Sequence, residues 1–457
     1  MKTKQLLTIF TIISFTSGLS IGRVKAQSAL DNYINAGLKN NIVVQQKNIA
    51  LDKAINALKE AKTYFLPSFN FNGTYTSGEG GRNIPLPIGD LLDPVYGTLN
   101  KLTQTNEFPQ ISNESINFFP TNFYDAKVRT SLAVYNSDLY YNKDIKKQQV
   151  QLQEYEVGTY KRDLVKDIKV AYYNYLMALS SEQIYQSAEG LVNKNVEVNE
   201  SLLKNGKGLP ASVLRAESEA ETIKNQILEA KNNATNAMHY FNFLLNKKQD
   251  ETIDTSINKQ LALSEVNKYI DQENISAREE LKMAALGEGI YFNAYQMNKQ
   301  FWQPKVSAFL DLGSQASDWA FNSQSKYYLV GAQVDIPIFN WFKNDYKTNE
   351  AQADYQSASL NTKYITEELQ LSADVAKNSL STAYSAYQTA LKQLSSAQSY
   401  FNLIEKGIKE GVNSQIEFID ARNQLTVSQI SVNINLYKVL QAMADVERET
   451  ATYQLQK

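Results

Sequence analysis

The chain has 457 residues, no cysteine, one histidine and a net charge of −2 from 46 basic and 48 acidic side chains. Without cysteine it can form neither a disulfide nor a thiolate metal site, and His239 alone cannot supply a zinc site. His239 also lies in a helical run without the strand–turn–helix elbow of a hydrolase, and the nearly balanced charge gives no reason to expect nucleic acid. We therefore expect no cofactor, no metal, no enzymatic activity and no nucleic-acid partner.

Residues 1–26 are typical of a secretory signal peptide. Lys2 and Lys4 form a basic start, residues 6–15 carry no charge, and the chain then reaches Ala26 in a small-x-small cleavage site. A membrane anchor is the competing interpretation, but the apolar run is shorter than the roughly 20 residues that a spanning helix needs. We expect the mature chain to begin near Gln27, outside the cytoplasm.

Residues 27–246 are predicted to form a first structural repeat: a helix, a strand pair and a helical hairpin. The strands are expected at about 68–78 and 123–136, where apolar and polar residues alternate, as in Phe69, Asn70 and Phe71. The segment between them, 76–122, is rich in Gly, Pro, Asn and aromatic residues. Loops of this length are usually functional or mobile, and we assign this one to the exterior.

Proline placement indicates very long helices. Only Pro210 occurs between residues 121 and 303, and no proline follows Pro337. Residues from about 145 to 203 and from about 345 to 403 should be uninterrupted helices of roughly 90 Å each, against an average of about 11 residues for ordinary helices. Two segments carry heptad-like apolar seams. These seams are Leu164, Ile168, Ala171, Tyr175 and Ala178, and Val432, Leu436, Val439, Met443 and Val446.

The second half repeats the first. An equatorial connector, 247–275, precedes a second repeat, 276–457, with a helix, strands at about 304–313 and 327–337, and a helical hairpin at about 340–455. The first hairpin occupies about 140–246. Gly206 lies ten residues before Ala216 and Gly411 ten before Ala421, so the two hairpin turns are offset by 205 residues. This offset indicates an internal duplication.

Four strands cannot close a barrel, since even a small, filled barrel needs about eight. An open sheet in lipid would leave unpaired backbone groups that cost several kcal/mol each. Aromatic residues beside the strands favour a membrane barrel over a soluble sandwich. They are Phe118, Phe119, Phe123, Tyr124, Trp319, Phe321, Tyr327 and Tyr328. We therefore predict an α+β membrane protein in which three copies pool twelve strands into a β-barrel and twelve helical rods into a hollow α-barrel. Two copies would give eight strands and an occluded barrel.

The order of these elements resembles that of the TolC family of outer-membrane efflux proteins, the outer membrane factors. Residues 31–41 (DNYINAGLKNN) look like the family's opening helix, although Ile42 replaces the usual proline. Three further segments look like the family's helix–strand corners: YFLP at 64–67, FWQP at 301–304 and VDIPIFN at 334–340. The segment IDA at 419–421 matches the family's LDA after the second turn. The resemblance covers essentially the whole mature chain.

The resemblance implies an exit duct in the outer membrane of a Gram-negative bacterium, with a large periplasmic portion. The duct would serve a tripartite efflux or type I secretion system. Its partners would be its own copies, outer-membrane lipid, a periplasmic adaptor (membrane fusion) protein and an inner-membrane RND or ABC-type pump. A secreted coiled-coil structural or adhesin protein is the alternative, but it leaves the two strand pairs unexplained. The substrate stays open.

Glu417 and Asp420 follow the second turn and share one helix face as an i, i+3 pair. Carboxylates at the matching family positions line the constricted periplasmic entrance. The resemblance therefore implies a ring of six carboxylates in a trimer, which would favour cations. The alternative is an ordinary solvated helix face.

The first turn matches the family less well. Ser212 and Arg215 stand at the positions equivalent to Glu417 and Asp420, and Arg215 is a possible gate partner for a neighbouring acidic residue. It is otherwise a surface residue. Asn413 and Ile408 occupy positions at which well-known members carry the Arg and Tyr of the gate lock. We therefore expect the closed state to be held differently or more loosely.

Overall fold

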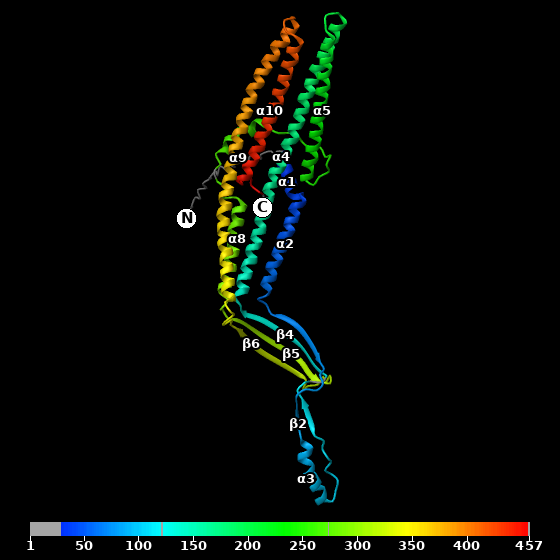
Figure 1. The fold of residues 1–457 in the computed structure, drawn as a ribbon, viewed down its shortest axis with the longest axis vertical. Coiled ribbons are helices and arrows are strands. Elements are labelled where there is room, and N and C mark those ends of the chain that lie inside the picture. Colours follow the sequence, from blue (N-terminus) through cyan, green and yellow to red (C-terminus); the bar gives the residue numbers. More distant parts are fainter. Residues whose placement is uncertain (1–28, 120–121, 273, 456–457) are drawn as a thin grey trace, which may run out of the picture. The chain divides into compact units, whose positions relative to one another are not determined.

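The computed structural model describes residues 29–119, 122–272 and 274–455, so the predicted signal peptide lies outside the described residues (Figure 1). The chain forms two compact units. Among the described residues, unit 1 comprises 29–42, 161–272 and 374–448, and unit 2 comprises 43–119, 122–160, 274–373 and 449–455. Each unit therefore takes segments from both predicted repeats.

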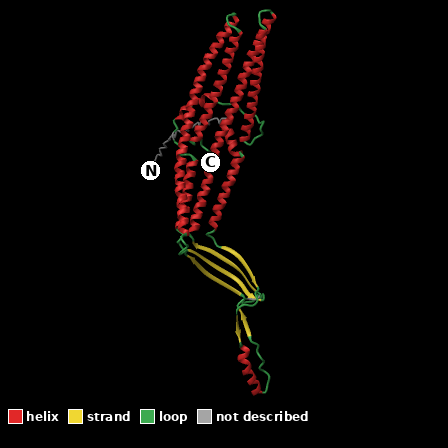
Figure 2. Ribbon diagram, in the orientation of Figure 1, coloured by secondary structure: helices red, strands yellow, loops and turns green. Residues whose placement is uncertain are grey.

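Unit 2 contains a four-stranded antiparallel sheet in the order β1-β4-β5-β6 (Figure 2). The strands are β1 (Ser68–Thr76), β4 (Phe123–Tyr135), β5 (Lys305–Ser317) and β6 (Lys326–Asp335). They lie where the alternation predicts them, although β5 continues four residues past the expected end at residue 313. The outermost strands, β1 and β6, each pair on one side only within the chain.

One face of this sheet is apolar and exposed. The register pairs Phe71 with Val128, Val128 with Leu312 and Leu312 with Tyr328, so their side chains form a row across all four strands. Phe71 and Tyr328 are 74% and 75% exposed in the single chain. Large apolar side chains gathered on one face normally mark contact with another apolar phase.

The other face carries cross-strand ion pairs. Arg129 on β4 binds Asp311 on β5 through two hydrogen bonds of 2.7 and 2.6 Å, and Asp311 is 1% exposed. Lys127 contacts Asp125 at 2.7 Å, and the Tyr327 hydroxyl donates to the same carboxylate at 2.7 Å. These pairs join β4, β5 and β6 by polar contacts on the side opposite the apolar row.

Aromatic rings gather where β1, β4 and β5 approach their connecting segments. Trp319 stacks on Tyr75 and on Tyr124, with ring centroids 5.3 and 5.6 Å apart, and Phe321 lies 4.5 Å from Tyr124. Tyr124, Trp319 and Phe321 belong to the aromatic set identified in the sequence. Aromatic belts of this kind are common where membrane strands meet the interface.

The segment between β1 and β4 has structure of its own. It contains β2 (Asn83–Leu86), α3 (Ile88–Thr103) and β3 (Glu114–Asn117), and β2 pairs with β3 in an antiparallel hairpin. In Figure 1 α3 is seen at the far end of this hairpin. The sequence indicated only a long loop here, because glycines and prolines such as Gly89, Pro94 and Gly97, which normally mark loops, lie within the helix.

Unit 2 also contains helices: α2 (Ile42–Thr63), α8 (Glu279–Lys299) and parts of α4 (Ser137–Lys204) and α9 (Lys343–Lys409). Ile275, Leu369 and Ala373 form a buried apolar cluster. The buried Arg278 side chain binds Glu280 at 2.8 Å and also pairs with Glu449.

Unit 1 contains the remaining helices and the rest of α4 and α9. They are α1 (Ala29–Asn40), α5 (Pro210–Leu244), α6 (Lys259–Ser264), α7 (Val266–Ile270) and α10 (Gln415–Glu449). The predicted uninterrupted helices are present, since α4 has 68 residues and α9 has 67. All ten predicted seam residues are buried or half-buried in this core. Ile168 and Val446 are fully buried, and Tyr175 and Val432 are half-buried.

The predicted connector, 247–275, joins the core of unit 1 by hydrogen bonds. Tyr172 donates its hydroxyl to the Asp254 carbonyl at 2.9 Å, and Tyr269 donates to Glu447 at 3.1 Å. Burial raises the pKa of both tyrosines well above the ordinary value, because a buried phenolate would lose its hydration. In the part of the chain that the structure describes, no helix is both long enough and apolar enough to cross a bilayer.

Candidate functional site

The two helical turns of unit 1 have the same backbone design. Gly206 and Gly411 both adopt φ +72°, a left-handed conformation that favours glycine. The Gly206 and Lys207 amides donate to Leu203 and Leu202, while the Gly411 and Val412 amides donate to Ile408 and Gly407. Each pair forms a Schellman motif at the end of a long helix, and the two motifs are 205 residues apart. The duplication therefore extends to individual hydrogen bonds.

In each turn the residue two positions after the left-handed glycine packs closely against the end of the preceding helix, and the two turns place a glycine on different sides of this contact. A Cβ on Gly208 would lie 2.8 Å from the Leu203 nitrogen, so glycine is needed after the first turn. In the second turn Asn413 occupies the equivalent position, and its side chain fills the space beside Gly407. Leu202 is the counterpart of Gly407. The glycine of this contact therefore follows the turn in the first hairpin and precedes it in the second.

Glu417 is a capping residue. Its Oε2 accepts hydrogen bonds from the Ser414 amide at 2.7 Å, the Ser414 hydroxyl at 3.0 Å and the Asn413 side chain at 3.3 Å. The Ser414 hydroxyl in turn accepts from the Glu417 amide at 3.3 Å, which completes a capping box at the start of α10. The Ser414 amide, then the Asn413 and Ser414 side chains, lower the pKa of Glu417.

Asp420 lies one turn further along α10 and is exposed. The capping bonds go to Glu417, whereas Asp420 projects from the helix surface beside the buried Ile419 and Ala421. The structure thus separates the two predicted ring residues into one with a local structural role and one on the open surface.

The first turn presents a cation. Arg215 is exposed on α5 and forms no ion pair with the residues that the structure describes. The Ser212 amide donates to the Leu209 carbonyl at 3.0 Å in the first turn of α5. No neighbouring acid within the described chain therefore holds Arg215, and its predicted role as a gate partner requires a second copy.

An ion pair joins the two hairpins inside unit 1. Arg422 on α10 donates to Glu219 on α5 at 2.8 Å, and Asn423 contacts the same carboxylate at 3.5 Å. Arg422 is 2% exposed, and its Nη1 has no hydrogen-bond partner among the described residues. Burial lowers its pKa, which the Glu219 carboxylate partly offsets.

Sequence analysis missed this pair. Arg422 stands two residues after the exposed Asp420, and its neighbours Ala421 and Leu425 belong to a buried apolar cluster. A basic residue inside an apolar seam was the signal that would have found it.

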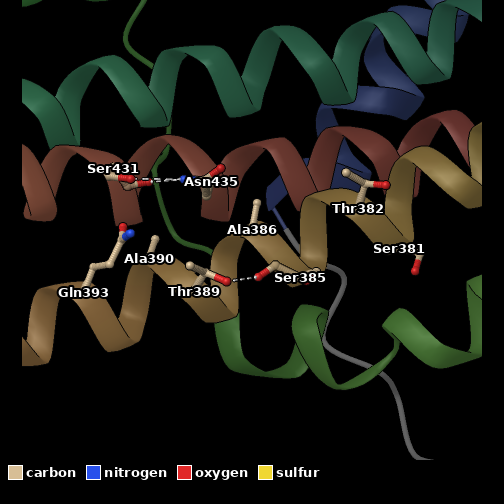
Figure 3. A pocket seen from close by; sticks show the side chains of 9 residues that line it. All are labelled: Ser381, Thr382, Ser385, Ala386, Thr389, Ala390, Gln393, Ser431 and Asn435. Atoms are coloured by element: carbon tan, nitrogen blue, oxygen red, sulfur yellow. Dashed lines mark hydrogen bonds between the residues drawn. The ribbon is translucent and has the colours of Figure 1, made fainter.

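A groove of small and polar side chains runs between α9 and α10 (Figure 3). Two of its polar side chains bond along their own helices: Thr389 donates to the Ser385 carbonyl at 3.0 Å, and Asn435 donates to the Ser431 carbonyl at 2.8 Å. Small side chains let another helix approach closely. Within the described residues, no cluster of potential metal ligands occurs.

Comparison with known proteins decides the family. The family model of outer membrane efflux proteins matches residues 33–246 and 272–451, which is most of the chain. The chain belongs to this family. The predicted TolC-like resemblance is therefore confirmed, and the family is one of outer-membrane efflux proteins, not of enzymes.

The relatives agree with the family. The chain is 25% identical to "Toxin and drug export protein A" of Aggregatibacter actinomycetemcomitans over 253 residues, 53% of either protein, so it spans about half the length of that relative. It resembles the outer-membrane channel OprN with a TM-score of 0.75 and 14% identity, covering 92% of this chain and 89% of that one. It also resembles CmeC of Campylobacter jejuni, with a TM-score of 0.72, 14% identity, and coverage of 93% and 85%. At these identities, the structural likeness is one of fold.

Proposed function

We propose that this efflux-family protein is the outer-membrane exit duct of a tripartite efflux or type I secretion system. In this proposal three copies join, and substrates pass from an inner-membrane RND or ABC-type pump and a periplasmic adaptor to the exterior. The secreted coiled-coil or adhesin alternative is set aside, because it accounts neither for the sheet nor for the family match.

The sheet is the observation that carries the proposal. It has an apolar face, a polar face with paired charges, and two outer strands whose far sides are unpaired within the chain. In lipid those edges must pair, and three copies joined β1 to β6 would supply twelve strands around a polar lumen.

The helices support the same assembly. The α9–α10 groove offers a close-packing face of small residues, and α4 and α9 are each about 100 Å along their axes at 1.5 Å per residue. Pooled from three copies, the four hairpin helices of each chain, α4, α5, α9 and α10, would line a periplasmic tube.

The proposal is tested by reconstituting the purified full chain into planar bilayers. We expect detergent-dependent trimers, seen by native mass measurement, and ion-conducting channels. Trimers without conductance, or monomers only, would overturn the proposed duct.

Asp420 and Glu417 are proposed to form the entrance ring, six carboxylates in the trimer. Because Glu417 also caps α10, Asp420→Asn is the cleaner substitution. We expect it to reduce cation selectivity and block by divalent cations, and Glu417→Gln/Asp420→Asn to reduce them further. Glu217→Gln, an exposed carboxylate on α5, is the matched control. Unchanged selectivity in the double variant would refute the ring.

Arg215 is proposed to pair with an acidic residue of a neighbouring copy and to help hold the entrance shut. We expect Arg215→Gln to raise basal conductance, whereas an exposed basic residue elsewhere on α5, such as Lys231, should be replaceable without this effect. Equal basal conductance in both variants would make Arg215 an ordinary surface residue.

The substrate class is left broad. The name of the Aggregatibacter relative refers to toxins as well as drugs, which is compatible with either kind of system. The choice between them depends on the pump and the adaptor.

A further inference from the structure

Helix α3 has two different faces. Counted at 100° per residue, Gly89, Asp93, Tyr96 and Asn100 lie on one side of the helix, and Ile88, Leu91, Val95, Thr98 and Leu102 lie on the other. The contacts of the two faces differ just as clearly.

The first face is packed against the chain that follows the helix. Tyr96 contacts Phe108 with ring centroids 5.5 Å apart, and Asn100 exchanges two hydrogen bonds with the Phe108 backbone, at 2.8 and 3.2 Å. Asp93 accepts from the Ile111 amide at 2.8 Å. At Gly89 a Cβ would collide with the Ile111 carbonyl. This face therefore already has its partner.

The second face is apolar and uncovered. Its exposed fractions are 37% for Ile88, 68% for Leu91, 51% for Val95 and 76% for Leu102. The hydroxyl of Thr98 donates to the Pro94 carbonyl at 2.8 Å, so the polar group of the fifth member is satisfied within the helix. The five positions are spaced 3, 4, 3 and 4 residues apart, which is the a/d spacing of a coiled-coil seam.

We propose that this seam docks against the α3 seams of the neighbouring copies, so that three α3 helices close together beyond the strand ends of the duct. The inference rests on the proposed trimer and adds to it an interface outside both barrels. Within each copy the segment 77–122 follows β1, an outer strand, so it is continuous with the edge at which a second copy is expected to pair.

Charge and spacing favour a copy of the chain over lipid. Residues 77–122 carry five acidic and two basic side chains, a balance of −3. An anionic lipid surface attracts basic segments, not acidic ones. A heptad seam, in contrast, is the pattern by which helices recognise one another.

The trimer, not the seam, would set the number of helices. Two heptads with β-branched Ile88 and Val95 at a positions do not select three strands by themselves, and an isolated helix of 16 residues is marginal in water. Attachment to a common base raises the effective concentration of the seams to the millimolar range, at which weak apolar contacts suffice.

The absence of cysteine from the sequence makes the test direct, since an introduced thiol is the only one in the chain. The full-length protein is prepared as Leu102→Cys, on the seam, and as Lys101→Cys, its exposed neighbour about 100° away around the helix. Each variant is oxidised as the purified assembly, and cross-linked dimers are counted on denaturing, non-reducing gels. A native mass measurement records the assembly state of the same samples.

We expect Leu102→Cys to cross-link about tenfold faster than Lys101→Cys, because seam contact holds the thiols together. Adding Leu91→Lys to Leu102→Cys should return the rate to that of Lys101→Cys while the trimer persists. Trimers in which both cysteines react at one rate, or in which Leu91→Lys changes nothing, would overturn the α3 contact and leave the duct standing. If no trimer forms, the proposed duct fails and the α3 contact fails with it.

Discussion

The carboxylate of Glu417 has a role in the turn that is separate from any role in a pore. Three hydrogen bonds to its Oε2 close the capping box that starts α10. A capping carboxylate is stabilising only while it is ionised, because the protonated form accepts these bonds less well.

The pH dependence of the second turn follows from Glu417. Its folded-state pKa lies below the ordinary value of 4.5, so its stabilising contribution is present above that value and is lost as pH falls through the lower, folded-state pKa. Val412 is 78% exposed at the turn, so a spin label can be attached there through Val412→Cys. The motion of the label should be slow at neutral pH and faster in acid. With Glu417→Ala added, which removes the accepting oxygens, the motion of the label should be fast at every pH. If neither acid nor the substitution of Glu417 alters the motion of the label, the capping role is contradicted.

The ion pair Arg422–Glu219 links the two hairpins inside unit 1. Removing one member leaves the other buried without its counter-charge, which typically costs about 3–5 kcal/mol for a fully buried pair. Because the Glu219 side chain is 24% exposed, we expect Glu219→Ala to cost less, about 2–3 kcal/mol. The denaturation midpoint of the purified protein measures the loss.

A double variant separates the pair from its parts. Glu219→Ala/Arg422→Met removes the buried charge altogether and should recover most of the stability, because apolar replacements of buried pairs are often neutral. If the double variant is no more stable than Glu219→Ala alone, the loss comes from packing and not from the uncompensated arginine.

At the scale of elements, the glycines of the long helices have opposite requirements. Gly411 adopts φ +72°, whereas Gly190 lies within α4, where an added Cβ would meet open space. Alanine in a left-handed position costs about 1–2 kcal/mol, but in a helix interior it stabilises by about 1 kcal/mol relative to glycine.

We therefore expect Gly411→Ala to lower the denaturation midpoint and Gly190→Ala to raise it. The two variants have identical chemistry, so each is the control of the other. A midpoint that rises in Gly411→Ala as it does in Gly190→Ala would mean that the backbone of the second turn differs from the Schellman geometry.

Sequence analysis predicted the elements well where the pattern was long. Proline-free stretches and heptads indicated α4 and α9, although α4 begins eight residues before and α9 ends six residues after the predicted bounds. Strict alternation indicated β1, β4, β5 and β6. Two features escaped it. Helix α3 contains Gly89, Pro94 and Gly97, which made its segment look like a loop. The burial of Arg422 depends on α5, which lies about 200 residues earlier in the chain.

At the scale of the whole molecule, the apolar face of the sheet should be the part that needs lipid. Phe71 and Asn72 are neighbours on β1 and, because side chains alternate along a strand, they lie on opposite faces. Lysine on a lipid-facing strand position costs about 2–4 kcal/mol at the middle of the bilayer, but little on a polar face.

We expect Phe71→Lys to reduce the amount of protein assembled in the outer membrane severalfold, and Asn72→Lys to leave it near the wild-type level. Quantitative recovery from outer-membrane fractions measures both. Equal tolerance of the two substitutions would mean that the apolar row does not face lipid.

The sequence by itself determined the type and length of the major elements, their duplication and the two glycine turns, because these depend on local periodicity and on backbone conformations that few residues tolerate. Only the tertiary structure decided which polar groups meet. The capping bonds at Glu417 depend on the turn's path, the pairing of Arg422 with Glu219 depends on how α5 and α10 pack, and the free seam of α3 was visible only once its other face had found a partner. Contacts between distant segments depend on three-dimensional packing, which no spacing along the chain records.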